Sequence, residues 1–141
     1  MKQQGRRLWR LVLLLCMSFC VSLLACTGEK EPKDKVADLE FTVVPEREIP
    51  EELQKLIRDK QKNPFKLSYS ADGCLYIVVG FGQKETGGYS VQVNELYLTE
   101  NAIVIDTDLL GPAQNEEVSQ APSYPYVVIC TEDRQESVVF R

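Results

Sequence analysis

The feature that most constrains the fold of this chain is a series of short apolar segments, separated by turn residues, that runs to Phe140. Each segment has the length of a β-strand and is too short for a typical helix. The predicted strands are Leu39–Val44, Phe65–Ser70, Cys74–Phe81, Tyr89–Leu98, Ala102–Leu109, Tyr124–Thr131 and Ser137–Phe140. Short and numerous strands of this kind predict a mainly β fold, either a small antiparallel β-sandwich or a partly open barrel.

Two of these segments carry further information about the sheet. Cys74–Phe81 is apolar at both parities, which is typical of a central strand covered on both faces. In Tyr89–Leu98, the apolar residues change parity halfway along the segment. Because one extra residue in a strand produces such a switch, we expect a β-bulge near Asn94–Glu95.

One helix is expected, over Pro50–Lys62. Proline suits the first helical position, and the acidic and basic residues lie where the helix dipole favours each charge. A narrow apolar stripe is formed by Leu53, Leu56 and Ile57. This single N-terminal helix would pack on one side or at one end of the β structure.

The N-terminal residues have the pattern of a secretory signal peptide. Basic residues precede a short apolar run, and Leu23-Leu24-Ala25 then leads into Cys26. This pattern predicts a signal peptide over residues 1–25 and, as in bacterial lipoproteins, a membrane anchor of acyl chains (palmitate) on Cys26. Ordinary secretion, with no lipid on Cys26, is the alternative. Residues 26–38 are polar and predict a lipidated cysteine with a flexible tether, followed by a single domain over residues 39–141.

Charge limits the partners of such a protein. Four of the 16 basic residues lie in the leader and none of the 21 acidic ones does, which leaves a net charge of −9 after cleavage. Because an acidic domain repels phosphate backbones and anionic lipid heads, nucleic acid is a poor candidate partner. Attachment to the membrane would depend on the lipid, and we expect an extracytoplasmic location in the bacterial cell envelope.

The sequence predicts no catalytic residues, metal or cofactor. The chain contains no histidine, which removes the Ser-His-Asp and Cys-His arrangements. Gly82 and Gly87 have the spacing of a phosphate loop, but the lysine that this motif needs is absent. Asp106 and Asp108 share one strand face, where two carboxylates can bind calcium or exchange protons, and a solvated strand face is the favoured interpretation.

Two cysteines remain in the predicted domain, Cys74 and Cys130. Outside the cytoplasm such a pair can form a disulfide. Both also lie in apolar segments, so two buried thiols are an equally good interpretation.

Two blocks of the sequence resemble the PrcB family, the protease complex subunit lipoproteins, in its C-terminal domain. The first block is Phe81–Val91, with its Thr-Gly-Gly-Tyr, and the second is Pro112 followed by Tyr124–Ile129. The resemblance covers residues 71–131, with the matched blocks between Leu75 and Thr131. It implies a non-catalytic module that binds and stabilises a secreted protease complex.

The candidate partner-binding residues lie in these two blocks. They are Thr86, Gly87, Gly88, Tyr89, Tyr124 and Tyr126. For Thr86-Gly87-Gly88, a signature of the fold is favoured slightly over a contact site, and for the tyrosines core packing is the favoured interpretation.

A weaker similarity connects the loop 84–89 with chagasin-type inhibitors of cysteine proteases, which present a similar loop from an immunoglobulin-like sandwich. The preceding Asn-Pro of those inhibitors is replaced here by Lys84-Glu85. The sequence therefore predicts a non-enzymatic binding module for an extracytoplasmic protein, with a protease inhibitor as the alternative.

Overall fold

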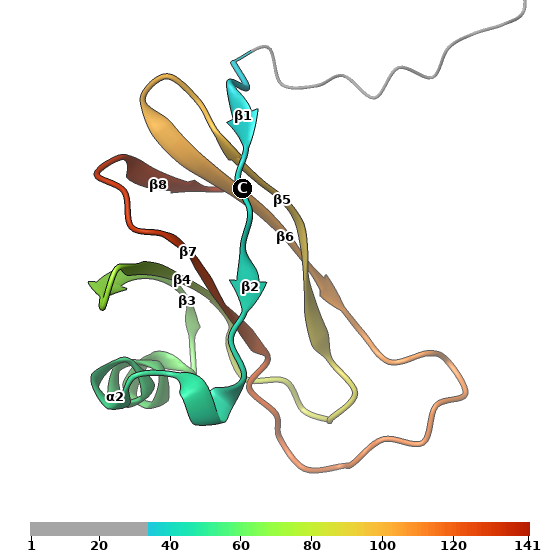
Figure 1. Ribbon diagram of the computed structural model, residues 1–141. Helices are drawn as coiled ribbons and strands as arrows, with labels where there is room; N and C mark the ends of the chain where they lie inside the picture. The colour runs from blue at the N-terminus through green and yellow to red at the C-terminus, as the bar shows by residue number, and fades with distance from the viewer. Residues whose placement is uncertain (1–33) are drawn as a thin grey trace, which may run out of the picture. The chain divides into compact units, whose positions relative to one another are not determined.

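The structure of the protein is a computed structural model that describes residues 34–141 (Figure 1). The leader, Cys26 and most of the predicted tether lie outside the described residues. The elements of the described part are β1 (Ala37–Asp38), β2 (Thr42–Val43), a 3-10 helix (Glu46–Glu48), α2 (Glu51–Lys60), β3 (Pro64–Ala71), β4 (Cys74–Phe81), β5 (Ser90–Leu98), β6 (Ala102–Leu110), β7 (Tyr126–Glu132) and β8 (Ser137–Phe140). No helix among these residues is long and apolar enough to cross a membrane.

The strands form two four-stranded sheets. Sheet A has the order β1-β5-β6-β8, and sheet B has the order β2-β7-β4-β3. The buried apolar residues of the inner faces pack together between the sheets, so the predicted β-sandwich is confirmed. Their buried members are Leu75, Ile77, Val79, Leu96, Ile103, Ile105, Val127 and Ile129.

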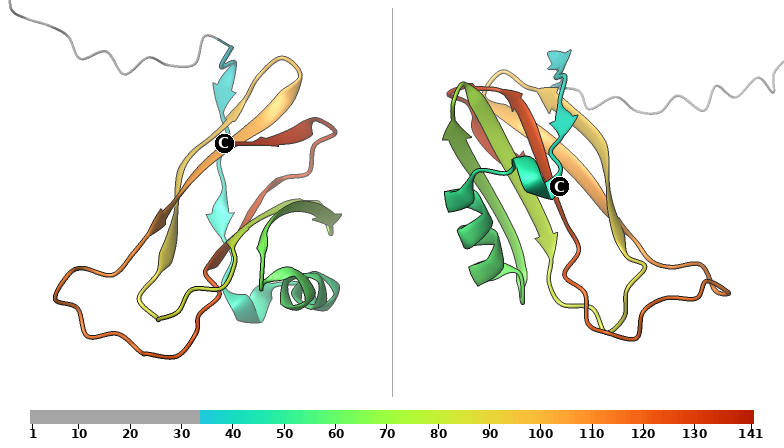
Figure 2. Two further views of the ribbon diagram at one scale, coloured as in Figure 1. Left: turned by 180° about the vertical axis from the view of Figure 1, so that it is seen from behind. Right: turned by 60° about the horizontal axis from the view of Figure 1, so that its bottom comes forward.

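The first two strands join the sheets along one side of the sandwich. β1 pairs with β5 in sheet A, and a few residues later β2 pairs with β7 in sheet B (Figures 1 and 2). Between them, the Thr131 hydroxyl donates a hydrogen bond of 2.8 Å to the Glu40 carbonyl. The sequence predicted one strand over Leu39–Val44 after a tether that ended at residue 38. Ordered pairing instead begins at Ala37 with β1, which precedes the predicted strand, and within Leu39–Val44 only Thr42 and Val43 form a strand, β2.

One pair of strands departs from the predicted antiparallel pattern, because β8 runs parallel to β6. β7 ends in sheet B, and the chain crosses to sheet A before β8 begins. At this crossing the Arg134 guanidinium donates hydrogen bonds of 3.2 Å to Glu132 and 3.1 Å to Glu136. The hydrogen bond from Arg134 is the main cause that lowers the pKa of the Glu136 carboxyl below its ordinary value.

α2 covers the outer face of sheet B. Leu53 and Ile57 are buried against Val78 and Val128 of the two central strands, together with Ile49. The predicted helix is confirmed, with Pro50 as its N-cap and its last residue at Lys60. Because α2 covers one face of β4 and the sandwich core covers the other, β4 is apolar on both faces, as the sequence predicted.

Two local features of the strands follow from single residues. The register of β5 with β6 shifts between Val93 and Glu95, so the predicted bulge at Asn94 is confirmed. Asp72 and Gly73 join β3 to β4 with φ angles of 53° and 78°. Positive φ at both positions is the geometry of a type I′ turn, which makes Ala71 and Cys74 the hydrogen-bonded pair that closes the hairpin.

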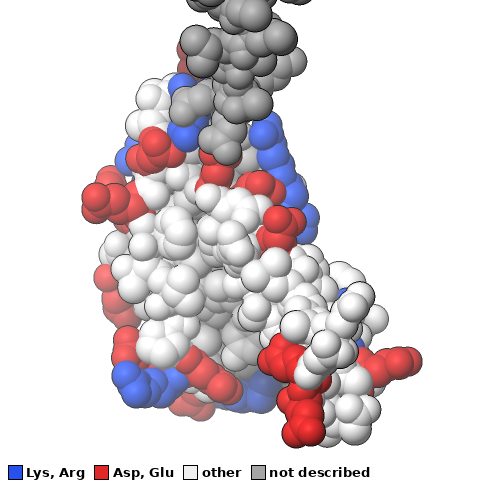
Figure 3. Space-filling view, turned by 90° about the vertical axis from the view of Figure 1, so that its right-hand side faces the viewer, with Lys and Arg blue, Asp and Glu red and all other residues white. Residues whose placement is uncertain are grey.

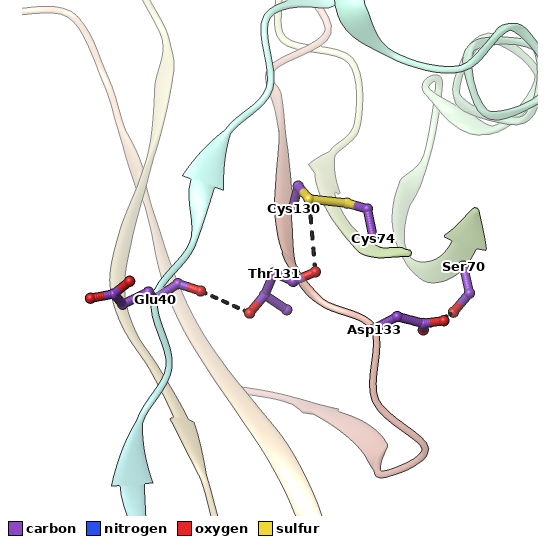
Figure 4. The surroundings of a disulfide bond; sticks show 6 residues. All are labelled: Glu40, Ser70, Cys74, Cys130, Thr131 and Asp133. Atoms are coloured by element: carbon purple, nitrogen blue, oxygen red, sulfur yellow. Dashed lines mark hydrogen bonds between the residues drawn. A yellow bond between two sulfur atoms is a disulfide. The ribbon is translucent and has the colours of Figure 1, made fainter. Parts of the chain in front are cut away.

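Cys74 and Cys130 form a disulfide, with their Cα atoms 5.8 Å apart (Figure 4). The two residues lie on neighbouring antiparallel strands, where Cys130 is paired with Tyr76, two residues along β4 from Cys74. Cys74 is buried and Cys130 is half-buried. Of the two alternatives that the sequence left open, the structure has the covalent bond.

Candidate functional site

Two long loops meet at one end of the sandwich. The loop 82–89 runs from β4 to β5, and the loop 111–125 runs from β6 to β7. β4 pairs antiparallel with β7 in sheet B and β5 with β6 in sheet A, so both loops leave the sheets at the same end. Figures 1 and 2 show them side by side at the bottom of the sandwich. We call residues 82–89 and 111–125 the paired loops.

Backbone hydrogen bonds hold the paired loops together. Lys84 and Ser123 form an isolated antiparallel bridge, with N···O distances of 2.8 Å and 3.0 Å in the two directions. The Gly87 amide donates to the Ser119 carbonyl at 2.8 Å, and the Ser123 hydroxyl donates to the Thr86 carbonyl at 2.6 Å. These contacts make the two loops one surface, which the sequence did not predict because residues 119–123 have no strand pattern.

Gly88 is required by this arrangement for two reasons. Its φ angle is 83°, a conformation that residues with a side chain rarely adopt. A Cβ atom at this position would also lie 2.5 Å from a methyl carbon of Val118 and 2.9 Å from Pro112. The second glycine of Thr86-Gly87-Gly88 therefore allows the loop 82–89 to lie directly against the loop 111–125.

We expect Gly88→Ala to lower the free energy of unfolding by about 1–3 kcal/mol, because it adds backbone strain and a steric overlap. The matched control is Gly87→Ala, whose Cβ would lie no closer than 3.4 Å to Ser119 and whose φ is not positive. Urea unfolding of the two variants measures the difference. Equal destabilisation by both variants would contradict the role assigned to Gly88.

The structure brings together five of the six candidate residues and separates the sixth. Thr86, Gly87 and Gly88 lie in the paired loops, and Tyr89 and Tyr124 are half-buried at the ends of these loops. Tyr126 instead lies in β7 and packs against the cluster beneath α2. Burial there is the main cause that raises the pKa of its phenol, and the negative charge of Glu46 adds to the effect.

The exposed charged side chains of the paired loops are acidic. Glu85, Glu116 and Glu117 are exposed, and Glu116 accepts a hydrogen bond of 3.0 Å from the Ala113 amide. Figure 3 shows Asp and Glu side chains on the lobe at the lower end of the face in view. These carboxylates would therefore favour a partner with a positively charged surface.

The two aspartates of β6 do not form a metal site in the structure. The side-chain amide of Asn94, the bulged residue, lies 2.9 Å from Asp108 and 3.4 Å from Asp106, and it donates to both carboxylates. Within residues 34–141, no three His, Cys, Asp or Glu side chains are grouped so that they could hold a metal ion. This arrangement fits a solvated strand face.

A cleft of about 920 Å³ lies at the other end of sheet B from the paired loops. It is lined by residues 38–42, by Gly73 of the β3–β4 turn and by Cys130–Glu132 at the end of β7. Three of these lining residues are acidic, and none is a lysine or an arginine. None of the six candidate partner-binding residues lines the cleft.

The fold and the site define a β-sandwich domain with one covering helix and a pair of joined loops at one end. Residues 75–132 match the family model described as PrcB C-terminal, so the resemblance found in the sequence is confirmed over this segment. The segment runs from β4 to the end of β7 and includes both of the paired loops. Among curated proteins and among solved structures, nothing matches the chain significantly.

Proposed function

We propose that this protein is a non-enzymatic surface lipoprotein whose paired loops bind an extracytoplasmic protein, most specifically a secreted protease complex that it stabilises. The observation that carries the proposal is the match to the PrcB C-terminal family, since the matched segment contains both loops. The absence of histidine from the chain agrees with a binding role, because the commonest general base is missing.

The described chain enters the sandwich at the end that is remote from the paired loops. The described chain joins the sandwich where Ala37 pairs with Leu98, whereas the loop 82–89 ends where β5 begins at Ser90. At about 3.4 Å per residue, these two ends of β5 lie about 27 Å apart. The paired loops therefore lie about one strand length from Ala37, where ordered pairing of the chain begins.

The disulfide supports the same location. Disulfides persist in oxidising compartments outside the cytoplasm and are rare inside it. The Cys74–Cys130 bond is therefore consistent with a leader that directs the chain across the membrane. Acylation of Cys26 itself is tested by mass spectrometry of the N-terminal peptide of the native protein.

The alternative, an inhibitor that inserts the loop 84–89 into a cysteine protease, is less well supported by the geometry. Lys84, Thr86 and Gly87 all use backbone groups to bind the loop 111–125. The loop is therefore one half of a wider surface, which suits a broad protein contact better than insertion into a narrow cleft. Inhibition of a purified cysteine protease by the soluble domain would favour the alternative.

Purification from native membranes in mild detergent tests the proposal. The wild-type protein should recover one discrete extracytoplasmic partner, and the double variant Glu85→Lys/Glu117→Lys should recover at least tenfold less of it. The control, Glu40→Lys/Glu100→Lys, changes the net charge by the same amount away from the paired loops, because Glu40 lines the cleft at the other end of sheet B and Glu100 lies in the β5–β6 turn. Recovery of no partner by a monomeric wild-type protein, or equal losses in both variants, would contradict the proposal.

A further inference from the structure

β3 forms a long free edge of sheet B. It has eight residues and is the last strand of its sheet, and β4 is its only strand partner among residues 34–141. The other edge strands are shorter, since β1 and β2 have two residues each and β8 has four, and they leave part of β5 and of β6 without an outer strand partner among residues 34–141. A long edge presents unpaired N–H and C=O groups, which another extended chain can bind as an added strand.

The turn at Asp72–Gly73 fixes which backbone groups of β3 are unpaired. Ala71 and Cys74 are the hydrogen-bonded pair next to the turn. From this pair onward, non-hydrogen-bonded and hydrogen-bonded pairs alternate along the hairpin. Lys66, Ser68 and Ser70 fall in the non-hydrogen-bonded pairs, so their N–H and C=O groups point away from β4. The side chains of the same three residues are exposed.

Positive charge gathers at the start of this edge, although the domain as a whole is acidic. Lys60 ends α2, Lys62 lies in the turn before β3, and Lys66 lies within the strand, and all three are exposed. The Lys66 ammonium lies 5.6 Å from the centre of the Phe140 ring. The other end of β3 leads into Asp72, so the sign of the charge reverses along the edge.

We propose that the free edge of β3 accepts an extended segment of a partner protein as an additional strand, with carboxylates of that segment beside Lys60, Lys62 and Lys66. The backbone of the segment bonds to the outward groups of Lys66, Ser68 and Ser70. Opposite charge then fixes its direction, with its acidic end at the start of β3. This surface adjoins the paired loops at Lys62, whose carbonyl accepts a hydrogen bond of 3.2 Å from the Gln83 amide, but it uses other residues and does not depend on the proposed function.

Two peptides with blocked ends serve as probes, and each has alternating valine and threonine residues and two glutamates. In one peptide the glutamates are at the N-terminal end, and in the other they are at the C-terminal end. The comparison peptides carry lysines in place of the glutamates. We expect one glutamate peptide to bind the purified full-length protein at least tenfold more tightly than its lysine counterpart. Amide hydrogen exchange should slow at Lys66, Ser68 and Ser70 when it binds.

Ser68→Pro is the sharpest variant, because it removes an outward N–H that no bond to β4 uses. It should abolish peptide binding, while Ser68→Ala, which keeps the N–H, should bind like the wild type. Lys66→Glu covers the case in which the proline variant does not fold. It leaves Lys60 and Lys62 in place, and it should reduce the preference for the glutamate peptide over the lysine peptide. Binding without slower exchange in β3, no binding at all, or an unchanged preference in Lys66→Glu would overturn the proposal.

Discussion

Removal of the Cys74–Cys130 disulfide should lower the free energy of unfolding by about 2–4 kcal/mol, one of the two largest effects that the structure predicts. The two cysteines are 56 residues apart in the chain, so the bond closes a long loop in the unfolded state. Its loss restores conformational freedom to that state, while the β4–β7 ladder still pairs the two strands in the folded state.

Denaturant unfolding of the wild type and of Cys74→Ala/Cys130→Ala, each with and without reductant, measures this effect. Reductant should lower the midpoint of the wild type to near that of the double variant and should leave the double variant unchanged. A double variant within about 0.5 kcal/mol of the oxidised wild type would show that the bond contributes little to stability.

Leu53→Ala should destabilise the domain by about 2–5 kcal/mol, because it leaves a cavity between α2 and sheet B. The Leu53 side chain is fully buried against Val78 and Val128. Leu56, one turn further along the same helix, is 39% exposed, which provides a matched control. Leu56→Ala removes the same atoms with the same change in helix propensity, and should cost less than about 1 kcal/mol.

Urea unfolding of the two leucine variants gives the comparison, and tryptic cleavage after Arg58 or Lys60 gives an independent one. The Leu53→Ala variant should be cleaved faster at these sites because α2 is held less firmly on the sheet. Similar losses of stability in both variants would show that α2 does not pack on sheet B through Leu53.

The sequence predicted those parts of the fold that depend on local patterns. Apolar alternation located the long strands, and the change of parity in β5 located the bulge at Asn94. The apolar residues at both parities of β4 indicated its central position, since α2 and sheet A cover its two faces. These patterns are visible because each records which side of one element is buried.

The remaining features depend on contacts between distant segments. The two short strands β1 and β2, in place of one strand over Leu39–Val44, follow from pairing with β5 and β7, which no property of the segment itself specifies. The parallel direction of β8 likewise follows from the crossing of the chain between the sheets after β7. Side-chain pattern reports burial, but it does not report the identity or direction of the neighbouring strand.

The candidate site was predicted only in part, because it too depends on contacts between distant segments. The glycines of Thr86-Gly87-Gly88 indicated a tight loop, and the positive φ of Gly88 agrees with that prediction. Its contact with residues 112–123 was missed, because those residues are polar and irregular in sequence. Tyr126 was grouped with Tyr124, although it lies under α2, since alternation in a strand does not show what covers each face.

Site-specific photo-crosslinking on intact cells tests the central claim, that a partner binds at the paired loops, most directly. A crosslinking residue at the exposed position of Glu117 should give one discrete crosslinked protein, whereas the same residue at Glu100 or Glu40 should give none. Crosslinks of equal yield from all three positions, or a discrete product only from Glu100 or Glu40, would contradict the account.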